Sequence, residues 1–590
     1  MESFPPESPQ APSLAEDPAL GLSRRTKLEI LGAVLLGLFL VALDQTIVGT
    51  ALPKIVTSLG GNDLYTWVVT IYLLTSTITV PFYGKLSDIY GRRPMLMIGI
   101  SLFLVGSALS GLSQEMWQLI LFRGIQGLGA GALFPIALAV IGDLFTPAER
   151  GKYQGLFGAV FGISFLIGPG LGGFLTDNVG WHWIFFVNIP IGIVSLAVIW
   201  KLLPTIKRSD ASRSLDYLGA LVFTVAIGFL LIGLTNKQSG DWTDFPVGGF
   251  VAIGLALSAV FVFVESKAKE PIVPLDLWRN RTYVSSILST FFVSFGFFGA
   301  IIFLPRWFQV VRHEAATASG YLIFPMLIGL IGSSIVAGAL VSRTGKYKAI
   351  VLAGLTSMAV GITLLTQLRA DTEYPALFLW MFVAGLGIGP TLSVFTIIVQ
   401  NAVPFSKLGV ATSNLTFFRQ VGGSVGLAIA GTLFGQSLAD QLPGQTDKVF
   451  DSMAAAAPAG AGAQIQQFQA VFNQAIASGD GINLNNQTGV GQSFGEAILH
   501  QVPAAFQSFF QPFVAQFDGA FNSAMSLAIA QTFWLGVIAT VLGLVAAVFM
   551  RELPLRTTMG HEPSAARDSR SDERTTTARE GMPLTAPAPD

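Results

Sequence analysis

Long apolar runs recur along almost the whole chain, and they constrain its fold more than any other feature. A run of about 20 apolar residues can cross the roughly 30 Å hydrocarbon core of a bilayer as a helix. An open strand would leave backbone groups unsatisfied in lipid, so each run is predicted to be a helix. The chain is therefore predicted to be an all-α polytopic membrane protein with 14 transmembrane helices. They lie near 29–53, 65–83, 95–112, 117–142, 153–175, 182–202, 215–235, 246–264, 283–308, 318–341, 349–368, 374–399, 408–435 and 524–550.

The composition excludes several other classes of protein. Only 12% of the 590 residues are Asp, Glu, Lys or Arg, about half the roughly 25% typical of soluble domains. The chain has no Cys, which excludes disulfides and thiolate metal sites. No HExxH zinc motif or GxxxxGK[ST] phosphate-binding loop occurs, so a metalloprotease and an ATP-driven pump are disfavoured. We expect no enzymatic activity, no metal, no cofactor and no nucleic-acid partner.

Positive charge predicts the orientation in the membrane. An even number of spans places both termini on one side, and 26 of the 34 Lys and Arg residues fall in segments on that side. Basic residues concentrate in cytoplasmic loops. Both termini are therefore predicted to be cytoplasmic, in a plasma or inner membrane. The charged, Pro-containing segments 1–28 and 551–590 are predicted to be disordered cytoplasmic tails.

Two hydrophilic turns reveal an internal repeat. Gly84 and Gly91 precede a basic cluster after the second span, and Gly338 and Gly345 precede another after the tenth. The copies are 254 residues apart, a separation that fits the duplicated halves of a transporter. The repeat predicts an N-terminal six-helix bundle, a linker with two extra transmembrane helices and a C-terminal six-helix bundle, at 29–203, 204–282 and 283–550.

Five short motifs lie in order on the first six spans. They are LDQTIVGTALP from Leu43, GKLSDIYGRRP from Gly84, LFRGIQGLGAG from Leu121, GPGLGG from Gly168 and WHWIFFVNIPIG from Trp181. Together they resemble the signatures of the major facilitator superfamily, specifically its fourteen-helix drug/proton antiporter branch. The resemblance covers about 29–435 and resumes in the last span. It departs at Ser164, where the antiporter motif has a glycine, and at His182, where Arg is usual.

The resemblance implies a major facilitator fold that works by alternating access. It implies proton-coupled antiport that exports hydrophobic or cationic small molecules across the bilayer, as in multidrug efflux and antibiotic resistance. The proton gradient would supply the energy, without a cofactor. The alternative is an exporter of lipids, siderophores or other endogenous amphiphiles on the same fold, because the aromatic-rich composition, with 46 Phe, suits either kind of cargo.

Asp44 is the leading candidate for proton coupling. A carboxylate within the bilayer core is costly and usually functional, although Asp44 could instead be a structural hydrogen-bonding residue in a wet cavity. At 1.5 Å per residue, Asp44 lies ~13 Å and Arg123 ~9 Å below the same membrane face, so the two residues could pair. The resemblance assigns Arg123 and Gln126 to a proton relay; Arg123 could instead be a structural charge.

Two further sets of residues are predicted from the motifs. A charged cytoplasmic turn would form a conformational latch, for which the alternative is a plain positively charged loop; its residues are Gly84, Asp88, Gly91, Arg92 and Arg93. In the second copy of the repeat Ser342 replaces Asp88, which predicts a weaker latch. Small residues on the fifth span allow close helix packing, and the resemblance gives them the role of an antiporter motif: Gly168, Pro169, Gly172 and Gly173.

Two further features of the C-terminal part bear on function, Arg419 and the long segment 436–523. Arg419 lies a few turns inside the thirteenth span, where its long side chain could extend toward the cytoplasm; the alternative is contact with a substrate cavity. The segment 436–523 is predicted to be an extracytoplasmic insert. Its two apolar stripes, near 465–476 and 506–521, predict helices packed on each other or on the membrane. Alternatives are an apolar vestibule for departing cargo and a docking site for an envelope partner.

Overall fold

The computed structural model confirms the predicted all-α fold class. It describes residues 22–59, 64–204, 216–237, 240–268, 271–457, 462–478, 493–502 and 504–555. Within these ranges the regular elements are helices, and 14 of them are long and apolar enough to cross a membrane. Most of the predicted tails, 1–21 and 556–590, lies outside the described residues, whereas 24–28 already belong to the first helix.

The first six spans pack around α4 and α1. Their helices are α1 (Arg24–Leu59), α2 (Tyr65–Tyr90), α3 (Arg92–Gly111), α4 (Met116–Leu144), α5 (Pro147–Asn178) and the pair α6 (Trp183–Phe186) and α7 (Asn188–Leu202). Helix α4 packs against α2 and α3, and α1 packs against α5 and α7. The core of this half is a continuous apolar cluster from α1, α3 and α4.

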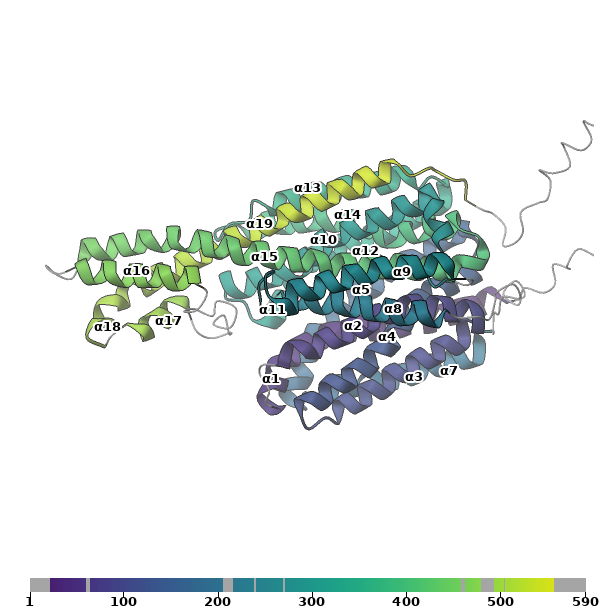
Figure 1. The fold of residues 1–590 in the computed structure, drawn as a ribbon, viewed down its shortest axis with the longest axis horizontal. Helices are drawn as coiled ribbons and strands as arrows, with labels where there is room; N and C mark the ends of the chain where they lie inside the picture. Colours follow the sequence, from purple (N-terminus) through teal and green to yellow (C-terminus); the bar gives the residue numbers. More distant parts are fainter. Residues whose placement is uncertain are drawn as a thin grey trace, which may run out of the picture.

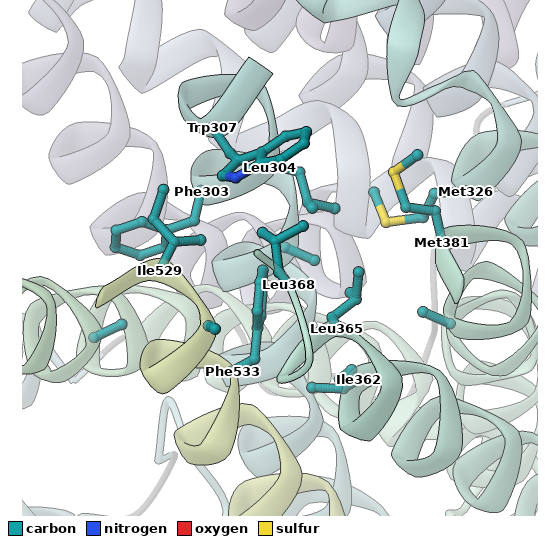
Figure 2. Close-up of a cluster of buried hydrophobic side chains, with 14 of the residues drawn as sticks. Phe303, Leu304, Trp307, Met326, Ile362, Leu365, Leu368, Met381, Ile529 and Phe533 are labelled. Carbon is teal, nitrogen blue, oxygen red and sulfur yellow. The ribbon is translucent and has the colours of Figure 1, made fainter. Parts of the chain in front are cut away.

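The last six spans form a second bundle. It contains α10 (Arg281–Val311), α11 (Ala316–Leu322), α12 (Phe324–Thr344), α13 (Lys348–Leu365), α14 (Tyr374–Ala402), α15 (Leu408–Ala456) and α19 (Val514–Val548). Its core brings Phe303 and Trp307 of α10 beside Leu368 and Phe533 (Figure 2). The indole Nε1 of Trp307 donates to Ser526 Oγ at 2.9 Å, so this buried polar group is satisfied.

The two extra helices lie against both bundles. Helices α8 (Tyr217–Asn236) and α9 (Phe250–Lys267) pack on each other, and α8 also contacts α2 and α15. Phe223 of α8 packs against Phe82 of α2 and Phe417 of α15, with ring centroids 5.7 and 5.2 Å apart. The extra pair therefore covers the line along which α2 and α15 meet.

The bundles are in close contact at the end of the molecule where α1 begins and α19 ends, here called the terminal end (Figure 1). A Cβ on Gly84 of α2 would lie 2.1 Å from Ser413 Oγ of α15. In the second copy of the repeat, a Cβ on Gly338 of α12 would lie 2.0 Å from the carbonyl oxygen of Gly151 of α5. The first glycine of each copy thus allows the two halves to touch.

The second glycine of each copy allows the turn itself. Gly91, between α2 and α3, has φ 101°, and Gly345, after α12, has φ 69°. Residues with a side chain rarely adopt these positive φ values. The two glycines of each repeat copy therefore meet two physical requirements: the first allows close contact between the halves, and the second allows a sharp reversal of the chain.

The insert is a cluster of helices beyond the opposite end of the bundle, here called the insert end (Figure 1). Helix α15 continues into it, followed by α16 (Gly462–Ser478), α17 (Phe494–Gln501), α18 (Ala504–Phe510) and the start of α19. The ring of Phe450 lies 6.1, 5.6 and 5.1 Å from those of Phe468, Phe472 and Phe517.

The apolar stripes of the insert are buried among its own helices. Phe472 is 6% exposed and Phe517 is 0% exposed. The prediction of helices packed on each other is therefore confirmed, and these rings do not line an open vestibule. The side chains of Ile476 and Phe506, which belong to the same stripes, lie outside the described residues.

Candidate functional site

A fully buried network surrounds Asp44 of α1. Its Oδ2 accepts a hydrogen bond from Arg123 Nη1 of α4 at 2.6 Å. Its Oδ1 accepts from Gln126 Nε2 at 2.8 Å and from Asn188 Nδ2 of α7 at 3.4 Å. The same Nη1 of Arg123 donates to Gln126 Oε1 at 2.9 Å. The three residues predicted for proton coupling therefore contact one another directly.

Other residues complete the environment of the ion pair. The guanidinium of Arg123 lies 4.1 Å from the ring centroid of Tyr72, and its Nε donates to the Val68 carbonyl at 3.3 Å. Asn188 also donates to Ser107 Oγ, at 3.1 Å. A buried ion pair is stable only when its remaining hydrogen-bonding groups are satisfied, and these residues meet that need. Sequence reasoning did not assign Tyr72, Ser107 or Asn188 to the site.

Glycines in α3 and α4 bring the helices close enough to form this network. A Cβ on Gly106 of α3 would lie 2.4 Å from the backbone nitrogen of Gln126. A Cβ on Gly127 of α4 would lie 2.5 Å from the carbonyl oxygen of Tyr72 of α2. The absence of a side chain at both positions allows α2, α3 and α4 to pack almost backbone to backbone around Arg123 and Gln126.

The predicted latch residues lie at the terminal end. Arg92 forms ion pairs with Asp88, at 2.6 Å, and with Asp143 at the end of α4, at 2.8 Å. Asp88 Oδ2 also accepts from the backbone N–H of Val410, at 3.1 Å, in the first turn of α15. Asp88 thus joins a charge cluster of one half to a helix of the other, whereas Arg93 is half-buried on α3.

Asp143 was missed by the sequence analysis. A signal for it existed, because α3 begins and α4 ends at the same side of the membrane, which places Asp143 near the basic turn. In the second copy of the repeat, Ser342 Oγ is buried and has no hydrogen-bond partner in the part of the chain that the structure describes. That half therefore has no counterpart of the Asp88 ion pair at this position.

The predicted antiporter motif lies between two neighbours of α5. A Cβ on Gly168 would lie 2.0 Å from Thr46 Oγ1, and one on Gly172 would lie 2.2 Å from Thr50 Oγ1, both on α1. The next residue of the motif, Pro169, faces the other half, where a Cβ on Gly320 of α11 would lie 2.9 Å from its ring.

Gly173 also faces that half, since a Cβ there would lie 3.3 Å from Thr317 Oγ1. The small residues therefore hold α5 between the helix that carries Asp44 and the C-terminal bundle.

Both departures from the family motifs are accommodated. Ser164 Oγ donates to the Val160 carbonyl of its own helix at 2.9 Å, and the Ser164 carbonyl accepts from Thr46 Oγ1 at 3.2 Å. The ring of His182 stacks on that of Trp181, with centroids 3.8 Å apart. Ser164 therefore preserves the close approach of α5 to α1.

Arg419 of α15 points toward the N-terminal half. Its guanidinium lies 5.9 Å from the ring centroid of Phe134 on α4. It lines a small pocket with residues that include Thr290, Ser294 and Phe297 of α10. The side chain therefore borders a pocket, and its contact with substrate stays a prediction. Among the described residues, no group of three or more His, Asp or Glu is placed to hold a metal ion.

Two helical bundles related by an internal repeat, with a buried polar network and a pocket facing the other half, define a membrane transporter. Residues 34–427 match the model of the Major Facilitator Superfamily, and the chain belongs to this superfamily. It is accordingly a multi-pass membrane protein that transports its substrate rather than an enzyme.

Characterised relatives and a solved structure agree with this assignment. The chain is 36% identical over 535 residues to the multidrug transporter protein MdtP of Bacillus subtilis (strain 168), covering 90% of this chain and 94% of the relative. It is 33% identical over 534 residues to multidrug resistance protein 3 of the same organism, covering 90% and 96%.

The fold is similar to that of a bacterial homologue of the human lysosomal transporter Spinster, solved in an inward-facing, unoccupied conformation. The TM-score is 0.51 at 15% identity, over 90% of this chain and 98% of that one.

Proposed function

We propose that this protein is a proton-coupled antiporter that exports hydrophobic small molecules, cationic ones among them, by alternating access. The observation that carries the proposal is the buried network of Asp44, Arg123 and Gln126. Relatives named as multidrug transporters support the choice of cargo. The cargo is a small amphiphile carried across the bilayer, and the energy comes from the proton gradient.

Asp44 is the residue that gains and loses the proton. An exchanger needs a site whose protonation differs between its two states, so that proton and cargo compete. The Arg123 guanidinium, at 2.6 Å, stabilises the charged carboxylate. A change in helix packing that separates the two groups favours the protonated acid instead. Gln126 bonds to both partners and so links the position of Arg123 to the charge of Asp44.

The terminal end faces the cytoplasm of the cell, and the latch stabilises the state that is closed there. The positive charge on that side supports this orientation. The contacts of Asp88 with Val410 and of Gly84 with Ser413 close the halves at that end. Releasing them opens the cargo pathway to the cytoplasm. Gly168 and Gly172 keep α5 seated on α1 during this change, and the packing of Pro169 against α11 limits the leak of protons.

Reconstituted vesicles test the proposal. With an imposed pH gradient and ethidium as the fluorescent cargo, the wild type should move ethidium uphill while protons flow down their gradient. Asp44→Asn should abolish both movements, because it mimics the protonated state permanently, whereas Asp44→Glu should retain part of the activity. Asp451→Asn, in the insert, is the matched control. Uphill ethidium transport with proton flux in Asp44→Asn would refute the assignment.

A further inference from the structure

We propose that Arg419 and Thr290 form a subsite that binds the anionic group of an aromatic cargo molecule. The inference rests on the export function proposed above and narrows its cargo. The sequence suggested hydrophobic or cationic substrates, whereas the pocket in the C-terminal half places a buried cation where cargo would bind. The subsite therefore extends the range of cargo to aromatic molecules that carry a carboxylate.

The Arg419 side chain carries one buried nitrogen that has no hydrogen-bond partner among the described residues. The side chain is 8% exposed, and the nitrogen is Nη2. Arg123, the other arginine at membrane depth, differs sharply, since its guanidinium donates to a carboxylate, an amide oxygen and a backbone carbonyl. A buried charge without a partner is costly, so an unpaired guanidinium beside a pocket indicates a missing ligand.

The C-terminal half supplies no counter-ion at this depth. Helices α10, α12, α13 and α14 contain no Asp or Glu. The first acid of α15 is Asp440, 21 residues beyond Arg419, which is ~32 Å along the helix. The buried carboxylate of the other half, Asp44, is already paired with Arg123. Among the described residues no carboxylate forms an ion pair with Arg419, so an anion from outside the chain can neutralise it.

Thr290 supplies a second donor to the same pocket. Its Oγ1 is buried and has no hydrogen-bond partner among the described residues. The neighbouring hydroxyls are already used, since Ser294 Oγ donates to the Thr290 carbonyl at 2.8 Å and Thr391 Oγ1 donates to the Ile388 carbonyl at 2.7 Å. Nη2 of Arg419 and the hydroxyl of Thr290 can thus both donate to oxygen atoms of one ligand group.

Aromatic side chains beside the pocket indicate that the rest of the ligand is aromatic. Phe297 lines the pocket, and Phe134 of the other half faces the guanidinium. The pocket has room for about one water molecule, far less than the roughly 300–1,000 Å³ of pockets that hold whole drug-sized molecules. The pocket therefore receives only one end of the cargo, a carboxylate, to which Nη2 of Arg419 donates a charge-assisted hydrogen bond. The aromatic body of the cargo lies toward Phe134.

Three probes with one aromatic body test the subsite: anthracene carboxylate, its methyl ester and aminomethyl anthracene. Binding to the full chain in neutral-lipid nanodiscs is measured by anthracene fluorescence. The wild type should bind the carboxylate most tightly. Arg419→Met should weaken carboxylate binding by about tenfold or more, the loss expected for one charge-assisted hydrogen bond. It should leave the ester unchanged, and Arg419→Lys should retain part of the preference.

Two further variants keep the test decisive. Thr290→Val should weaken carboxylate binding without removing a charge, which a general loss of folding would not do selectively. Arg306→Met removes another arginine packed over an aromatic ring, that of Phe434 at 4.7 Å, but outside the pocket, and should change nothing.

Equal affinity for the three probes, no binding of the carboxylate, or an equal loss in Arg306→Met would overturn the subsite and show that only water satisfies Arg419. Ethidium transport in vesicles is measured separately, and only its failure would remove the export function.

Discussion

Asp44→Asn should destabilise the protein, and a second substitution, Arg123→Gln, should restore its stability without restoring transport. In the native network, Arg123 is 1% exposed and Asp44 supplies its only counter-charge among the described residues. Removing one partner of a buried ion pair costs about 3–5 kcal/mol, because the remaining charge stays buried. With both charges removed, the amide side chains at the two positions can still bond to Gln126.

The measurement is thermal or denaturant unfolding of the single and double variants in nanodiscs, combined with the vesicle assay. We expect the double variant to regain at least about 2 kcal/mol relative to Asp44→Asn, a coupling in the range measured for contacting residues. Proton-driven transport should stay absent in both. Equal stability of Asp44→Asn and the wild type would show that the pair does not hold the helices together. Transport by the double variant would show that Asp44 does not carry the proton.

Three other variants test different parts of the molecule. Asp88→Asn should weaken transport. It should shift the ratio of the state closed at the terminal end to the state open there about tenfold for each 1.4 kcal/mol of latch stabilisation lost. An unchanged distance between labels placed across the Asp88–Val410 contact would contradict the latch. Replacing 440–515 by a short linker should leave membrane insertion and proton coupling intact but change the cargo range, and identical transport of every cargo tested would argue against this role. Gly129→Ala, whose Cβ would lie 2.3 Å from the Phe103 nitrogen, should lose about 1–3 kcal/mol of stability. Gly228→Ala, with no atom within 4 Å, is its control; equal melting temperatures for the two would contradict the packing argument.

The depth of the candidate residues could be predicted from the sequence, whereas their contacts could not. Membrane helices run nearly parallel, so counting residues from the ends of α1 and α4 placed Asp44 and Arg123 at similar depth. Which helices touch depends on glycines such as Gly106 and Gly127, whose effect is visible only when their neighbours are known. The direction of Arg419 was open for the same reason, because a long side chain can turn either way along its helix.

The insert shows a second limit of prediction from the sequence. Its apolar stripes predicted packed helices, because spacing of three and four residues is a local signal. No local pattern indicated that α15 is one helix of 49 residues. Pro443 and Gly444 resemble the end of a helix, since proline removes a backbone donor and glycine favours other conformations. Tertiary contacts override this local preference, as Leu442 and Phe450 on either side are buried against the rest of the insert.

The continuous helix α15 makes the insert a mechanical extension of the C-terminal half. At 1.5 Å per residue the helix is a rod of ~74 Å. One tip, at Val410, is tied to Asp88, and the other, near Phe450, forms the core of the insert. A tilt of about 10° at the latch displaces the far tip by ~13 Å over that length. We therefore expect the insert to move farther than the base of α15 during the proposed transport cycle. An antibody fragment that holds the insert on a fixed support should then stall transport without touching the pocket or Asp44.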